Sequence, residues 1–382
     1  MKRKANQVNK GKRIKVLLVE PDFPIAAKSK NHSHFLPIGL LKIGSYHRSR
    51  GDQVRLVRGI SNEDASFVPN KILITSLFTY WSKFVADAAH HYHRLFPKAE
   101  VEIGGVYASL LPEHCKAKNP FAKVRKGLYR NGVAENVPID FSLLPEELDY
   151  QIVHTSRGCK RQCTFCGTWK IEPEFTYKET ILPEIKKRKL VFYDNNLLAN
   201  PCIDEILKEI SAFRLKGLPL SCESQSGFDL RLLTPEKAQL LKDANFKNPR
   251  IAWDGRYSSW PRVKKAIKIL QDVGYSTENI FVFMIYNFEL SYAEMRQKLD
   301  ACRRWGVRVI DCRYRPLDST DDCYKSSVKC QSTGEYYIHP NWTDKQVRGF
   351  RRGVRRQNIA ILLNLPHNRY IPGCERGYVN VQ

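Results

Sequence analysis

Three cysteines on one short segment are the residues whose type and spacing most clearly suggest chemistry. Cys159, Cys163 and Cys166 follow a C-x3-C-x2-C pattern directly after an apolar run that predicts a strand. Three thiolates on one loop can bind three corners of an iron–sulfur cube and leave the remaining iron open to another ligand. A closed structural zinc site would need a fourth protein ligand, and only His154 is close in sequence. The alternatives, a zinc knuckle or three unrelated core cysteines, fit the strand–loop–helix context less well.

The residues around these cysteines suit a loop wrapped around a cluster. Gly158 and Gly167 flank the loop and permit tight backbone turns. Lys160 and Arg161 lower the net negative charge of thiolates and cluster and favour the ionised thiols. The segment therefore predicts a metal-binding loop.

The elements before this loop alternate as expected for a parallel sheet with helices on both faces, a Rossmann-like domain. Strands are predicted at residues 14–20, 53–57, 71–76 and 100–103, and helices at 38–50 and 79–96. Proline and glycine interrupt the pattern around residues 115–150, which predicts a domain boundary there.

After residue 150 strands and helices alternate again, and this predicts an incomplete α/β barrel with six strands, a partial (β/α)6 barrel. The predicted strands are 151–155, 190–193, 220–223, 250–253, 280–285 and 307–313, and the predicted helices are 179–187, 203–215, 235–243, 260–273 and 292–305. The predicted organisation is a basic tail (1–13), a Rossmann-like domain (14–115), a linker (116–149), the partial barrel (150–315) and a basic C-terminal extension (316–382).

Polar side chains follow several of the predicted barrel strands. Parallel strands of one sheet end at the same edge, so these side chains are expected to lie near the cysteine loop. A helix N-cap after a strand also favours Asp, Asn or Ser, so either role is open for each residue. The candidates are Asp194, Asn195, Glu223, Ser224 and Asp254, with Ile285 as an apolar candidate at the fifth strand.

The cysteine loop resembles the signature of the radical S-adenosylmethionine (radical SAM) superfamily. Phe165 before the third cysteine fits that pattern and is a further candidate for cofactor binding. The resemblance implies that Cys159, Cys163 and Cys166 bind a 4Fe-4S cluster whose open iron chelates S-adenosylmethionine. Reductive cleavage would yield a 5′-deoxyadenosyl radical that modifies a C–H bond of an unidentified substrate, by methylation or another radical reaction.

The resemblance also implies roles for the strand-end residues and makes the chain a transferase or an oxidoreductase. Asp194 and Asn195 would meet the amino group of the cofactor's methionine part, Glu223 and Ser224 would add polar groups, Asp254 would bind the ribose, and Ile285 would line the adenine. A flavodoxin- or ferredoxin-type donor would supply the electron. No catalytic residue is assigned.

The N-terminal half resembles the cobalamin-binding-type domain of a radical SAM subgroup, through residues 37–41, 50–54 and the Gly104-Gly105 turn with its following segment. The Asp-x-His-x-x-Gly motif that supplies a lower-face ligand to cobalamin is absent. Other histidines occur without that context, namely His32, His34, His90, His91 and His93. Some relatives bind cobalamin without the motif and others keep only the fold, so cobalamin stays open.

The net charge of +24 favours a polyanionic partner or an anionic substrate, although a solvated basic surface would look the same. An arginine stripe at helical spacing is the most concentrated positive charge, and nucleic acid is one candidate partner. The alternative function is accordingly a nucleic-acid-binding protein with a structural iron–sulfur or zinc site. The stripe consists of Arg348, Arg351, Arg352, Arg355 and Arg356.

Eleven cysteines, with no apolar run long enough to span a membrane and no signal peptide, predict a cytoplasmic protein whose thiols serve metal binding or catalysis. Five cysteines lie late in the chain, and most are expected to be buried and inert, with a second cluster as the weaker alternative. These are Cys302, Cys312, Cys323, Cys330 and Cys374.

Overall fold

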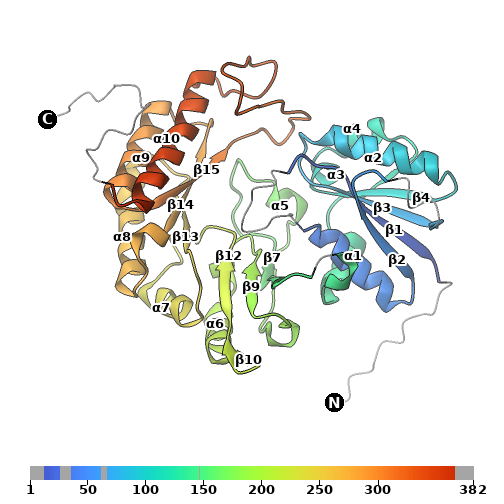
Figure 1. The fold of residues 1–382 in the computed structure, drawn as a ribbon, viewed down its shortest axis with the longest axis horizontal. Coiled ribbons are helices and arrows are strands. Elements are labelled where there is room, and N and C mark those ends of the chain that lie inside the picture. Colours follow the sequence, from blue (N-terminus) through green and yellow to red (C-terminus); the bar gives the residue numbers. More distant parts are fainter. Residues whose placement is uncertain (1–12, 26–35, 62–66, 146, 366–382) are drawn as a thin grey trace. The chain divides into compact units, whose positions relative to one another are not determined.

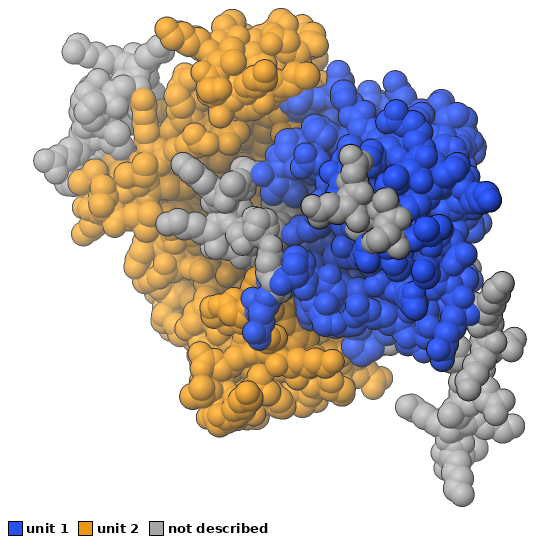
Figure 2. Space-filling model, turned by 45° about the vertical axis from the view of Figure 1, so that its right-hand side comes forward, with its two compact units in different colours: residues 1–148, 163–173, 316–322 blue, residues 149–162, 174–315, 323–382 orange. Residues whose placement is uncertain are grey.

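The computed structural model describes residues 13–25, 36–61, 67–145 and 147–365 (Figure 1). The chain forms two compact units, coloured separately in Figure 2. Unit 1 comprises residues 1–148, 163–173 and 316–322. Unit 2 comprises residues 149–162, 174–315 and 323–382. No described helix is both long enough and apolar enough to cross a membrane.

Unit 1 contains the predicted Rossmann-like parallel sheet, with strand order β2-β1-β3-β4-β5. Strand β1 alternates its side chains between two cores: Leu17 and Val19 pack on one face, and Val16 and Leu18 on the other. The strands are β1 (Lys15–Glu20), β2 (Gln53–Arg58), β3 (Lys71–Ser76), β4 (Glu100–Gly105) and β5 (Lys123–Val124).

Helices cover both faces of this sheet, as predicted. Helix α2 (Ser82–Leu95) packs into the core of Leu17, and α1 (Ile38–Ser49) into the core of Val16. The remaining helical segments of unit 1 are α3 (Val106–Leu110), α4 (Pro112–Lys118), α5 (Thr168–Ile171), and the 3-10 turns η2 (Tyr129–Asn136) and η3 (Phe141–Leu143).

The segment 116–149, expected to be a linker, is part of unit 1 instead. It supplies β5 to the sheet, and Leu143 and Leu144 are buried in the same core as Leu18. Its prolines and glycines obscured these contacts because they break the local periodicity without preventing burial.

Unit 2 contains six parallel strands in chain order, as predicted for a partial barrel. They form two three-stranded groups, β12-β9-β6 and β13-β14-β15, and a parallel bridge between Phe228 and Ile251 links the second group to the segment after β12. The strands are β6 (Tyr150–Val153), β9 (Lys189–Phe192), β12 (Ser221–Ser224), β13 (Arg250–Ala252), β14 (Phe281–Tyr286) and β15 (Arg308–Arg313).

Five helices share one core with a single face of these strands. The C-terminal extension contributes α10, whose Val347, Phe350 and Val354 are buried in this core. The helices are α6 (Ile203–Ala212), α7 (Pro235–Asp243), α8 (Trp260–Asp272), α9 (Tyr292–Arg304) and α10 (Asp344–Leu362). Shorter elements are the pairs β7 (Ser156–Arg157) with β8 (Thr176–Tyr177) and β10 (Arg214–Leu215) with β11 (Leu218–Pro219), and the turns η4 (Leu182–Glu184), η5 (Leu197–Ala199), η6 (Tyr257–Ser259) and η7 (Thr277–Asn279).

The helix predicted at residues 179–187 does not form, and only the short turn η4 occurs there. Pro183 lacks the N–H that a helix starting at residue 179 would need at that position. The buried Gln151 side chain donates to the carbonyl of Glu184 (2.6 Å) and accepts from the N–H groups of Lys186 (2.8 Å) and Lys187 (3.1 Å). A long-range side chain thus satisfies backbone groups that a helix would have paired internally.

Candidate functional site

The cysteine loop follows β6 and β7 in unit 2 and leads into α5 of unit 1, with the change of unit between Gln162 and Cys163. Cys159, Cys163 and Cys166 are free thiols of intermediate exposure. No three Cys, His, Asp or Glu side chains of the described residues are gathered closely enough to hold a single metal ion.

Short backbone contacts shape both ends of the loop. Gly158 has φ +72°, a conformation that favours glycine, and the next residue, Cys159, accepts a hydrogen bond on Sγ from the N–H of Arg161 (3.4 Å). At the other end the carbonyl of Cys163 accepts from the N–H of Cys166 (3.1 Å) and from the indole N–H of Trp169 (3.2 Å). N–H donors to a sulfur stabilise a thiolate, as cluster ligation requires.

A buried carboxylate holds the start of the loop. Asp194 is 2% exposed, and one of its oxygens accepts from the N–H and hydroxyl of Ser156 (2.6 and 2.8 Å) and of Thr155 (3.0 and 2.7 Å). These contacts join the end of β9 to the turn between β6 and β7. They favour a positioning role for Asp194 over the predicted contact with a cofactor.

A second buried carboxylate reaches the middle of the loop. Asp229 is 5% exposed and lies 4.0 Å from the guanidinium of Arg161. It also pairs with Arg231 (2.7 Å) and accepts from the Asn196 amide (3.3 Å). Sequence reasoning missed Asp229 because it lies beyond the strand end, in a segment with no local motif.

The strands of unit 2 have a helix-free face, opposite the shared core. Along β14 the buried side chains of Val282, Met284 and Tyr286 belong to that core, so Phe283 and Ile285 point to the other side. The same alternation assigns these residues to the helix-free face: Tyr193, Glu223, Arg250, Asp254, Phe283, Ile285, Ile310 and Cys312.

Charged groups of the helix-free face are arranged around β12 and β13. Arg250, 6% exposed, pairs with Glu223 and donates to the carbonyl of Ser224. Ser224 itself is buried, and its hydroxyl donates to the carbonyl of Ser226 (3.1 Å), so it serves the turn rather than the predicted cofactor site. Glu223 stays half-exposed on the helix-free face.

Asp254 follows β13 and is the strand-end acid whose carboxylate is least used in contacts within the described protein. Its half-exposed carboxylate has no hydrogen-bond partner among the described residues, and Lys298 and Arg161 act on it only at longer range. Burial raises the pKa of Asp254, and the two cations oppose that rise. The prediction that Asp254 contacts a ligand is compatible with this setting.

The other predicted residues divide between the two units. Asn195 is exposed at the end of β9 and donates to the carbonyl of Gly158 (3.4 Å), next to the first cysteine. Ile285 is half-exposed and pairs in register with Cys312 of β15. Phe165 is half-exposed in the unit 1 part of the cysteine loop.

The late cysteines differ from the expectation of buried, inert thiols. Cys302 is buried as expected, but Cys312, Cys323 and Cys330 are exposed, and Cys374 lies outside the described residues. Solvent reaches Cys312 on the helix-free face, yet enough protein surrounds it that burial raises its pKa to about 12. Cys312 is therefore a neutral thiol near pH 7.

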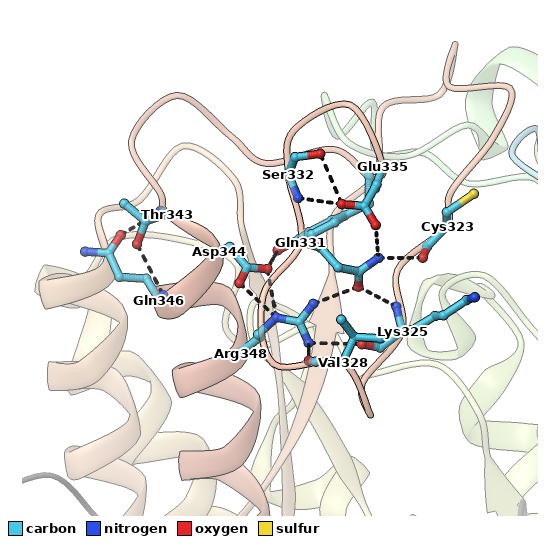
Figure 3. A network of polar contacts seen from close by, with 11 residues as sticks. Cys323, Lys325, Val328, Gln331, Ser332, Glu335, Thr343, Asp344, Gln346 and Arg348 are labelled. Carbon is cyan, nitrogen blue, oxygen red and sulfur yellow. Dashed lines mark hydrogen bonds and ion pairs between the residues drawn. The ribbon is translucent and has the colours of Figure 1, made fainter.

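The arginine stripe is helical, as predicted, but it is not one continuous anion-binding face. Arg348 is 3% exposed, pairs with Asp344 (2.8 Å) and donates to Gln331 (2.7 Å) and to the carbonyl of Val328 (2.5 Å). Figure 3 shows this guanidinium enclosed by the loop that precedes α10. Arg352 and Arg355 are exposed, and Arg351 and Arg356 are partly buried.

The fold is thus that of a two-unit α/β protein, a Rossmann-like sheet joined to a partial parallel barrel. Its cysteine loop follows the first barrel strand.

Two solved structures share this fold, both of the radical S-adenosylmethionine methyltransferase TsrM from Kitasatospora setae. The one with cobalamin and a 4Fe-4S cluster has a TM-score of 0.58 and 13% identity, covering 85% of this chain and 80% of that chain. The one with tryptophan substrate and the analogue aza-SAM has a TM-score of 0.57 and 13% identity, covering 80% and 74%. No protein-family model and no curated protein matches the sequence.

Proposed function

We propose that this chain is a radical SAM enzyme in which Cys159, Cys163 and Cys166 bind a 4Fe-4S cluster and S-adenosylmethionine. The observation that carries the proposal is the three-cysteine loop after the first of six parallel strands, which form the two three-stranded groups of unit 2. The fold that the chain shares with TsrM supports it. When bound, the cluster and S-adenosylmethionine supply one-electron cleavage of a sulfur–carbon bond, with the electron delivered by an external flavodoxin- or ferredoxin-type protein.

The protein's own contribution would be to hold the cysteine loop and to present polar groups to the cofactor. Asp194 fixes the entrance of the loop, and Asp229 restrains Arg161. Asn195, Glu223, Asp254 and Ile285 would contact S-adenosylmethionine from the strand ends and the helix-free face. The substrate would bind on the same face, because a sheet's ligands collect at the carboxyl ends of its strands.

We further propose methyl transfer with cobalamin on unit 1, because the TsrM structure contains cobalamin. The carboxyl ends of β1 and β3 lead into an aromatic group that offers flat apolar surface to a corrin ring. Phe78, 40% exposed, stacks on Tyr80 at 5.0 Å, whereas Phe23, which stacks on Trp81 at 5.2 Å, is buried and holds the group against the core. The aromatic side chains that follow β1 and β3 are thus suited to packing against a macrocycle.

The test is cofactor analysis of protein purified and reconstituted without oxygen. We expect about four irons per chain, absorption near 400 nm, and 5′-deoxyadenosine or S-adenosylhomocysteine after reduction with S-adenosylmethionine. Cobalt retained through gel filtration would support the cobalamin proposal. A chain that takes up no iron, or that never consumes S-adenosylmethionine, would rule out the enzyme.

We propose nucleic acid as a partner of the exposed cations of unit 2. The exposed cations of α8 and α10 include Arg262, Lys264, Lys265, Lys345, Arg352 and Arg355. We expect binding of tRNA or duplex DNA that weakens steeply with salt, and a shallower salt slope for Arg352→Ala/Arg355→Ala. The matched control is Lys186→Ala/Lys208→Ala, which removes two exposed cations outside α8 and α10. Salt-independent binding, or none, would exclude this partner.

A further inference from the structure

Lys298 of α9 is a fully buried lysine, 0% exposed, although an ammonium group normally stays in water. Its Nζ donates to the carbonyl oxygens of Trp253 (2.6 Å) and Gly255 (3.0 Å) and lies 5.0 Å from the centre of the Trp253 ring. No carboxylate of the described residues lies within 4.0 Å of it. The buried charge is therefore stabilised by carbonyl dipoles, by an aromatic face and by more distant acids.

The two carbonyls that Lys298 binds belong to the residues on either side of Asp254. Trp253 is buried in the helix-side core, so the next side chain, Asp254, points toward the helix-free face. Lys298 thus holds the turn at the end of β13 by two hydrogen bonds from the core side, while the Asp254 carboxylate projects from the other side. Loss of these two hydrogen bonds would make the turn more mobile without removing any group from the helix-free face.

We propose that Lys298 is a positioning residue that fixes the turn at residues 253–255 and so presents the Asp254 carboxylate to the nucleoside of bound S-adenosylmethionine. The inference rests on the proposed function, because it assumes that the helix-free face binds this cofactor. A carboxylate accepts hydrogen bonds from the two ribose hydroxyls best when its position is fixed before binding.

The charge of Lys298 gives this role a measurable signature. Burial lowers the pKa of Lys298 to about 8, while Asp254, Cys302 and Glu294, the groups that face it, act in the opposite direction. The ammonium charge is therefore present below this pH and lost above it. If Lys298 merely filled space, wild type and a variant without this lysine would show the same pH dependence of ligand affinity.

The experiment measures binding of aza-SAM to the reconstituted full chain by equilibrium dialysis at about pH 7 and about pH 9. We expect the wild-type affinity to fall about tenfold between these values. Lys298→Met should bind about tenfold more weakly at the lower pH and show a smaller pH dependence than wild type, because only the amines of aza-SAM itself still titrate in this range. Lys268→Met, which removes an exposed lysine of α8 to which no binding role is assigned, should behave as wild type.

Two further variants, Asp254→Asn and the double variant Lys298→Met/Asp254→Asn, test whether Lys298 acts through Asp254. The double variant should bind no more weakly than Asp254→Asn alone, because both changes remove the same interaction. Additive losses, or an Asp254→Asn variant that keeps the wild-type pH dependence, would overturn the inference, and the latter measurement remains decisive if Lys298→Met does not fold. A wild type that binds aza-SAM with pH-independent affinity overturns only this inference, whereas one that takes up neither cluster nor aza-SAM overturns the proposed function.

Discussion

Replacing Cys163 by alanine should abolish both the absorption near 400 nm and the consumption of S-adenosylmethionine, because two thiolates cannot retain the cluster. Cys163 is the middle ligand of the loop, and its carbonyl also receives the N–H groups of Cys166 and Trp169. The substitution keeps the backbone and therefore keeps these two contacts. The expected loss is in the metal chemistry and not in the fold.

Cys330→Ala is the matched control, since Cys330 is also a free thiol but is exposed and lies outside the loop. Iron content, spectrum and product formation are measured on both variants, with circular dichroism to compare their folds. A Cys163→Ala protein that still holds four irons, or a Cys330→Ala protein that loses them, would contradict the assignment of the cluster to this loop.

Asp194→Asn should destabilise unit 2 by about 3 kcal/mol or more and lower cluster occupancy in the protein that remains folded. The carboxylate accepts hydrogen bonds from two N–H groups and two hydroxyls, and an amide would place its own N–H donors against some of them. Because these donors belong to Thr155 and Ser156, the damage falls on the turn that leads into the cysteine loop.

Urea unfolding monitored by circular dichroism gives the free energy of unfolding for this variant. Asp272→Asn provides the comparison, because that exposed aspartate at the end of α8 pairs only with solvent-facing Lys268, and its loss should cost about 0.5 kcal/mol. If Asp194→Asn matched Asp272→Asn in stability and kept full iron content, the positioning role of Asp194 would be wrong.

Much of the architecture could be predicted from local sequence. The apolar runs and their spacing identified all six parallel strands of unit 2 and the first four strands of unit 1, to within one or two residues. Periodicity is a property of neighbouring residues, so it can be recognised without knowledge of the tertiary structure. The helix expected at residues 179–187 failed because Gln151, far away in the chain, binds that segment's backbone.

The roles of individual polar residues depended on the tertiary structure. The spacing of Arg348 on α10 indicated one exposed stripe, but the preceding loop folds over it and buries its guanidinium against Gln331. In the same way Asp194 proved to be enclosed, while Asp254, also at a strand end, remained open. Residue type at a strand end does not reveal which side chains other segments will cover.

By itself the sequence determined the cysteine loop, the order of strands and helices and the positive charge, because each depends on residue type and on spacing along the chain. Only the tertiary structure decided that residues 116–149 belong to unit 1. It also decided that Asp194, Asp229 and Arg348 are buried. In addition, it placed the buried Lys298 where it binds the two carbonyls beside Asp254. These outcomes follow from contacts between distant segments, and such contacts determine which polar groups are paired and which stay available to a ligand.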